Sequence, residues 1–194
     1  LFLEYKNIIV FFHALAAAIG VGAATITDIF FFKFLKDYKI SESEHSTMET
    51  LSGVIWVALG LLILTGIGLF IPQSDVLLQS SKFLTKVFAV LVLVVNGVLL
   101  NLVVSPRLME ITFGEEHNHM KGELHFFRRI ALALGGISIA SWYAIFILGS
   151  IRSIPVSAGF GIILYLSALA LAIGGSYVLD RMMIRKRRKE LENK

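Results

Sequence analysis

The sequence of 194 residues contains no cysteine and only three prolines. The lack of cysteine excludes disulfide bonds, thiol catalysis, iron–sulfur clusters and thiolate metal sites. Charged residues are also scarce, because Asp, Glu, Lys and Arg make up 16% of the chain, whereas a soluble domain has about a quarter. The composition therefore argues against a soluble protein.

Apolar residues make up 56% of the chain and fall in long blocks, with a mean hydropathy of +0.78. Only helices and closed barrels span a bilayer, and blocks of this length are typical of membrane helices. We predict an all-α polytopic membrane protein, a five-transmembrane-helix bundle within residues 1–180, followed by a basic cytoplasmic tail at 181–194. The predicted spans cover residues 8–35, 51–71, 82–104, 126–149 and 156–179.

The basic residues predict how the chain lies in its membrane. Most Lys and Arg residues follow the first, third and fifth apolar blocks, which places them on one side. The positive-inside rule then puts the carboxy terminus in the cytoplasm and the amino terminus outside, in the plasma (inner) membrane. We expect the lipid bilayer, and no nucleic acid, as the partner of these charges. Recurrent small residues predict close helix approach, within the bundle or in a homodimer.

Two ionisable residues lie inside the first span, His13 and Asp28. At a rise of about 1.5 Å per residue they are roughly 22 Å apart, one near each membrane surface. Ionisable groups inside membrane helices are costly, so each marks a site by default. Lys86 lies at the same depth in the third span as His13 does in the first, and the two are predicted to meet. The alternative is that Lys86 snorkels to the surface and His13 bonds a neighbouring helix.

Asp28 also needs a partner, because a buried carboxylate is costly when it is unpaired. Arg128 or Arg129, which begin the fourth span on the same side, is the natural choice. Such a pair would form a salt bridge that fixes the helix order, or would take part in a proton relay. In a further alternative, the arginine would bind a propionate. Asn96 and Trp142 lie mid-span and are expected to bond across the bundle or to line a cavity.

Polar segments give further local predictions. Ser43 or Ser46 is expected to cap the second helix, and Ser46 with Glu49 has the spacing of a capping box. Pro72 is predicted to end that helix. His117 and His119 lie in the longest hydrophilic stretch. They are better explained by a solvated loop than by a metal site, because no cysteine or fixed carboxylate accompanies them.

The order of these features resembles that of the HemJ-type protoporphyrinogen oxidases and the related CopD-like membrane domains. His13 stands early in the first helix, in FFHALAAAIGVGAA, and Met48-Glu49 precedes the second helix. Lys86 opens the third helix in SSKFLTKVF, after a short outer loop. The fourth helix, from Phe126, follows a hydrophilic inner loop. The likeness covers residues 8–150.

The resemblance implies that His13 is the axial ligand of haem b and that Lys86 is required for catalysis. Arg129, Asn96 and Trp142, chosen from their places in the spans, complete the cofactor-binding candidates. We therefore expect an integral membrane protein that binds a b-type haem, or a related porphyrin or quinone, in a redox role. An oxidoreductase similar to protoporphyrinogen oxidase is the enzyme class that this implies.

The alternative function belongs to a different class. It is a small transporter, a channel or a non-catalytic membrane subunit with a polar path through Asp28 and Arg129. The sequence leaves both functions open. A haem protein requires a Soret band, and a transporter requires flux that depends on Asp28.

Overall fold

The computed structural model describes residues 2–37, 42–107, 123–152 and 155–192. These residues form helices and turns, with no strand among them. The long helices are α1 (Phe2–Asp37), α2 (Glu42–Phe70), α4 (Ser81–Leu99), α6 (Glu123–Ser150) and α7 (Ala158–Glu192). The all-α prediction is therefore confirmed.

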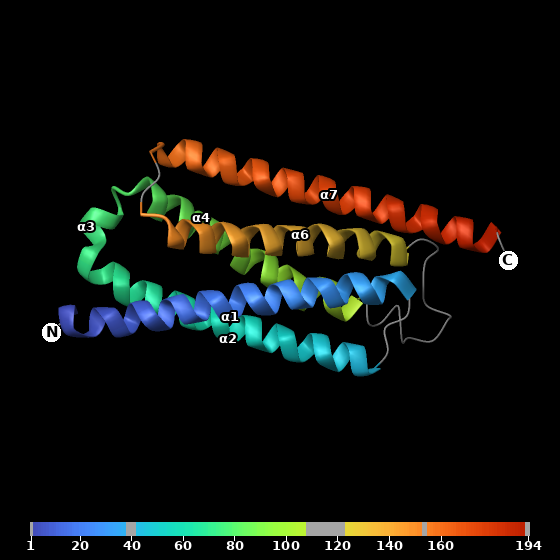
Figure 1. Cartoon of the computed structure of the whole chain (residues 1–194), viewed down its shortest axis with the longest axis horizontal. Coiled ribbons are helices and arrows are strands. Elements are labelled where there is room, and N and C mark those ends of the chain that lie inside the picture. The colour runs from blue at the N-terminus through green and yellow to red at the C-terminus, as the bar shows by residue number, and fades with distance from the viewer. Residues whose placement is uncertain (1, 38–41, 108–122, 153–154, 193–194) are drawn as a thin grey trace.

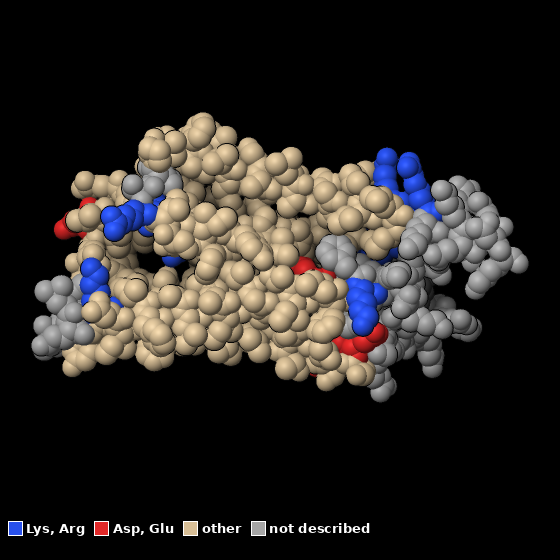
Figure 2. Space-filling view, in the orientation of Figure 1, with Lys and Arg blue, Asp and Glu red and all other residues tan. Residues whose placement is uncertain are grey.

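The part of the chain that the structure describes has five helical segments that are long and apolar enough to cross a membrane. They lie side by side in one elongated bundle, and the two termini lie at opposite ends of it (Figure 1). We call these the N end and the C end of the bundle, after the terminus at each. Lys and Arg side chains gather near the two ends of the visible face, and between them lies a mostly uncharged zone with a small patch of Asp or Glu atoms (Figure 2). This is the surface of a multi-pass membrane protein.

Helix boundaries follow the sequence signals only in part. Pro72 ends the second long helix as predicted, since it lies in the 3-10 turn η1 (Ile71–Gln73) that follows α2. The capping prediction is wrong, because α2 begins at Glu42 and so contains Ser43, Ser46 and Glu49. The predicted tail from residue 181 continues α7 as helix to Glu192. His117 and His119 lie outside the described residues.

The third span changes its winding near the C end. After α4 comes a π-helix, η2 (Leu100–Val104), shortly before Pro106. Proline has no backbone N–H, so a carbonyl of the preceding turn loses its usual partner and the winding adjusts. Asn101, within η2, accepts a hydrogen bond from the Ser52 hydroxyl of α2 at 3.0 Å. The π-helix thus carries a side chain that links α4 to α2.

The helices pack as two groups joined by α6. The first group is the pair α1 and α2, and the second is α4, α6 and α7, with α6 also packed along α1. Glycines permit the closest approaches: a Cβ at Gly20 would overlap the Trp142 ring, and one at Gly136 would lie 3.1 Å from the Ala172 carbonyl oxygen of α7. Between α2 and the second group the side chains leave room for a cavity.

Candidate functional site

A cavity of about 600 Å³ lies in the C-end half of the bundle. Its walls come from α1, α2, the α4–η2 segment and α6, and α7 contributes none of the described lining residues. Most of the wall is apolar or aromatic, with Phe31, Trp56 and Trp142 as the rings. The polar lining residues are Thr27, Asp28, Glu49, Ser52, Asn101, Ser105 and Ser138. The volume falls in the range of small-molecule sites, roughly 300–1,000 Å³.

Asp28 is the charged side chain at the membrane-embedded part of this wall. It projects from α1 toward α6, where a Cβ on Gly135 would lie 3.0 Å from its Oδ1 atom. Glycine at that position therefore makes room for the carboxylate. Among the residues whose side chains the structure describes, none forms a hydrogen bond or ion pair with Asp28. The second acid of the wall, Glu49, is exposed at the rim of the cavity.

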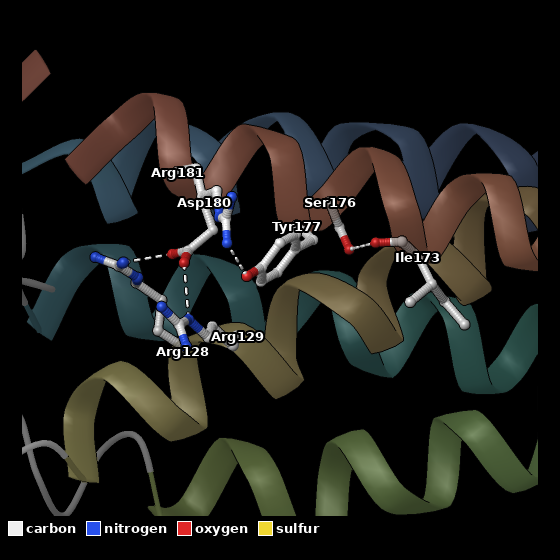
Figure 3. A network of polar contacts seen from close by, with 7 residues as sticks. All are labelled: Arg128, Arg129, Ile173, Ser176, Tyr177, Asp180 and Arg181. Carbon is white, nitrogen blue, oxygen red and sulfur yellow. Dashed lines mark hydrogen bonds and ion pairs between the residues drawn. The ribbon is translucent and has the colours of Figure 1, made fainter. Parts of the chain in front are cut away.

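The predicted pairing of Asp28 with Arg128 or Arg129 is wrong. Both arginines bind Asp180 of α7 instead: Arg128 Nη2 donates to Oδ1, and Arg129 Nε donates to Oδ2 at 2.9 Å (Figure 3). Asp180 is 0% exposed and Arg128 is 1% exposed, whereas Arg129 is 51% exposed. The carboxylate of Asp180 thus takes up the basic charge that would otherwise be available to Asp28.

Sequence reasoning missed Asp180 because it ended the fifth span at residue 179. The helix in fact continues, so Asp180 remains on the face of α7 that packs against α6. A signal was available in the spacing of the buried positions along α7, which follow a helical period. These positions are Gly161, Tyr165, Leu169, Ser176 and Asp180.

Tyr177 extends this cluster toward the surface of α7. Arg181 donates a hydrogen bond from Nη2 to the Tyr177 hydroxyl at 2.6 Å, and its guanidinium lies 4.6 Å from the centre of the ring (Figure 3). The guanidinium of Arg129 lies 5.9 Å from the same ring centre. Cations favour the face of an aromatic ring, so Tyr177 helps to hold two arginines beside Asp180 at the C end.

At the N end the predicted meeting of His13 and Lys86 is confirmed. Lys86 Nζ lies 3.3 Å from His13 Nε2, and His13 Nδ1 lies 2.8 Å from Thr65 Oγ1. The Thr65 hydroxyl in turn donates to the Leu61 carbonyl oxygen at 2.6 Å. The cluster joins α1, α2 and α4 and lies apart from the cavity, since none of its members lines it.

The contacts favour one assignment of the protons in this cluster. With Lys86 as an ammonium, it can only donate, so His13 Nε2 accepts. The proton of the neutral imidazole is then on Nδ1 and is donated to Thr65 Oγ1. The Thr65 hydroxyl is left free to donate to the Leu61 carbonyl oxygen, as its 2.6 Å distance requires. In this arrangement both ring nitrogens of His13 and the Thr65 hydroxyl have partners, and Lys86 uses one of its three N–H donors.

The remaining cofactor candidates are dispersed. Asn96 donates from Nδ2 to the Leu134 carbonyl oxygen at 3.1 Å, and its buried Oδ1 has no partner among the described residues. Trp142 lines the cavity, and its buried indole N–H likewise has no partner in the described part of the chain. The structure therefore brings His13 and Lys86 together but does not gather Arg129, Asn96 and Trp142 around them.

The residues present do not fit a haem group. An axial histidine must offer a nitrogen lone pair, but His13 Nε2 already accepts from Lys86 at 3.3 Å. The cavity presents Asp28 and Glu49 and, among its described lining residues, no Lys, Arg or His that would pair with propionates. Arg129 is engaged by Asp180. Nor do the described residues contain a group of three or more His, Asp or Glu side chains arranged to hold a metal ion.

No family model matches the sequence, and no curated protein or solved structure was found that is similar to it. The resemblance to HemJ-type and CopD-like proteins therefore stays a prediction that rests on the sequence features alone. The geometry of the cavity is the firmer guide to function.

Proposed function

We propose that the chain binds a hydrophobic organic cation, of the class of tertiary or quaternary amines, in its cavity and passes it across the membrane. One observation carries this proposal. Asp28 belongs to a membrane-spanning helix and lies on the wall of a cavity of about 600 Å³. Among the described residues it has no basic partner. An unpaired carboxylate there must hold a proton or face a cation.

The walls of the cavity support an organic cation over a bare metal ion. A hard metal ion needs several oxygen ligands at about 2.0–2.6 Å, and the described residues contain no group of three or more His, Asp or Glu side chains that could hold one. Trp56, Trp142 and Phe31 instead line the cavity with aromatic rings. Aromatic rings attract organic cations and pack against their apolar substituents. Charge from Asp28 and apolar contact from the rings together define the ligand class.

Passage across the membrane would require an opening toward the N end. Leu59, Leu93 and Trp142 line the cavity and also belong to the buried core, so they close the cavity on its N-end side. On the C-end side the lining includes Glu49, Ser105 and Pro106, which are exposed. The proposed transport cycle therefore starts from a state that is open toward the C end.

We further propose that the C end is cytoplasmic and that the membrane is the plasma (inner) membrane. The described arginines at that end, Arg107, Arg128, Arg129, Arg181 and Arg185, support this orientation through the positive-inside rule. The cavity would then be loaded from the cytoplasm, which makes export the direction of transport.

Binding and transport are tested with Asp28→Asn, which keeps the shape of the side chain and removes its charge. We expect tetraphenylphosphonium binding to purified protein, measured by equilibrium dialysis, to weaken roughly ten- to hundredfold, the order of the Coulomb attraction between unit charges about 6–8 Å apart at an effective dielectric constant of about 20. Glu49→Gln, at the rim, should weaken it only a few fold. Asp75→Asn, on an exposed acid outside the cavity, is the matched control and should bind as the parent does.

Transport is measured separately, as ethidium entry into proteoliposomes loaded with DNA, where bound dye fluoresces. Protein-dependent entry that disappears in Asp28→Asn supports the proposal. Equal binding by the parent and Asp28→Asn would rule out the site. Binding without any protein-dependent entry would rule out transport.

The haem, porphyrin or quinone function is the second candidate, and the meeting of His13 with Lys86 is the observation in its favour. Its test is the absorption spectrum of the purified protein after incubation with haemin. Because His13 Nε2 accepts from Lys86, we expect no Soret band beyond that of free haemin. A shifted Soret band that is lost in His13→Ala would overturn this expectation and restore the redox proposal.

A further inference from the structure

The N end of the bundle carries a second polar site, of the opposite charge to the cavity. Lys86 is only partly exposed and lies one helical turn inside the start of α4, with its Nζ 3.3 Å from His13 Nε2. Lys82, one turn nearer the end, donates from Nζ to the Ile151 carbonyl oxygen at 2.7 Å. The two ammonium groups are close enough to repel each other, because residues four apart share a helix face.

No acid compensates this charge among the residues whose side chains the structure describes. The described acid at the N end, Asp75, is exposed and forms no ion pair with Lys82 or Lys86. His13 cannot compensate it either, because a neutral imidazole supplies an acceptor but no negative charge. Two neighbouring cations at the edge of an apolar bundle are costly unless an anion joins them.

The lysines also have hydrogen bonds left to give. An ammonium group has three N–H donors, and the described contacts use one at Lys86, to His13, and one at Lys82, to Ile151. Room beside Lys86 comes from Gly149 of α6, where a Cβ would lie 3.7 Å from Nζ. The space-filling view shows a hollow near the N end with Lys or Arg atoms beside it (Figure 2).

From these observations we propose that the N end holds a small oxyanion, a phosphate or carboxylate group, bridged between Lys86 and Lys82. His13 positions the Lys86 ammonium by accepting a hydrogen bond from it at Nε2. The Thr65 hydroxyl, which lies 2.8 Å from Nδ1 and donates to the Leu61 carbonyl oxygen, holds the imidazole in place. The oxyanion belongs either to a dissolved molecule or to the headgroup of an anionic lipid, since both present the same acceptor atoms. This site is independent of the cation cavity and of its function.

Two arms of one experiment distinguish the sources. In the first, the full chain in a neutral detergent is dialysed against radiolabelled inorganic phosphate. In the second, the chain is released from nanodiscs of phosphatidylglycerol and phosphatidylcholine, and retained lipids are identified by native mass spectrometry. Saturable phosphate binding indicates a dissolved oxyanion, whereas selective retention of phosphatidylglycerol indicates the lipid.

Variants test the residues in whichever arm gives a signal. Lys86→Gln should weaken binding about tenfold or more, which corresponds to about 1.4 kcal/mol, and Lys82→Gln should weaken it several fold. Lys86→Arg keeps the charge and should retain most of the binding. If Lys86→Gln loses binding and Lys86→Arg does not, the loss comes from the missing charge and not from misfolding. Arg152→Gln, on an exposed cation at the same end, is the matched control.

The proposal is overturned if neither phosphate nor phosphatidylglycerol is bound selectively. It is also overturned if Arg152→Gln weakens binding as much as Lys86→Gln, because the signal would then come from general positive charge. The Lys82→Gln variant gives a third test, provided that it elutes from a size-exclusion column as the parent does. If its binding is unchanged, Lys82 does not contact the oxyanion and the proposed geometry is wrong.

Discussion

The buried carboxylate of Asp180 gives the sharpest prediction for stability. Asp180→Asn keeps the side-chain shape but removes the carboxylate that Arg128, 1% exposed, binds through Nη2. Removing one partner of a buried ion pair costs about 3–5 kcal/mol, because the other charge stays buried. We expect the free energy of unfolding to fall by an amount in that range.

The two arginines should differ strongly although both bind the same carboxylate. Arg129 is 51% exposed, so water screens its charge, and Arg129→Gln should cost no more than about 1 kcal/mol. Arg128→Met leaves Asp180 buried with only the exposed partner and should cost nearly as much as Asp180→Asn. The double variant Arg128→Met with Asp180→Leu removes both buried charges, and we expect it to recover most of the loss.

The assay is reversible unfolding in mixed detergent micelles, followed by circular dichroism as the sodium dodecyl sulfate fraction rises. Asp75→Asn, on an exposed acid, controls for net charge and should change little. A cost below about 1 kcal/mol for Asp180→Asn would refute the reasoning, since it would place the pair within the range of surface salt bridges. Equal costs for Arg128→Met and Arg129→Gln would refute it as well.

Two glycines give further predictions. Gly135→Ala would place a Cβ 3.0 Å from Asp28 Oδ1; we expect several-fold weaker tetraphenylphosphonium binding in dialysis, and unchanged binding would contradict the placement of Asp28 on the cavity wall. Gly20→Ala would drive a Cβ into the Trp142 ring, and the overpacking should cost roughly 1–3 kcal/mol in the unfolding assay. Its control is Gly22→Ala, where nothing lies within 4 Å, and equal effects at both positions would contradict the packing described.

The sequence was sufficient for the architecture and for one of the two polar clusters. Long apolar blocks leave a membrane helix as the practical structure, so the five spans could be predicted. The depth of a residue along its span also follows from a fixed rise per residue, which is why the meeting of His13 and Lys86 could be predicted. Depth does not say which neighbour a side chain faces, so Asn96, Trp142 and Arg129 could not be placed.

The prediction of which acid pairs with the arginines failed for a related reason. Hydropathy ends a span where polar residues begin, whereas a helix ends only where its backbone hydrogen bonds end. Asp180 therefore fell one residue beyond the predicted end of the fifth span, although α7 continues to Glu192. The cavity was also beyond prediction, since it depends on how α1, α2, α4 and α6 pack against one another, and no local sequence pattern records that packing.

The position of Asp180 explains how an acid can remain unpaired in a chain of net charge +4. A carboxylate in an apolar bundle attracts whatever basic side chain can reach it, so a lasting cation site needs nearby arginines to be engaged elsewhere. Asp180 engages both Arg128 and Arg129 in the described structure, and Tyr177 holds Arg129 and Arg181 at its ring. The ion pair at the C end is thus more than an attachment of α7 to α6, because it keeps the basic charge away from the cavity where Asp28 is proposed to meet its ligand.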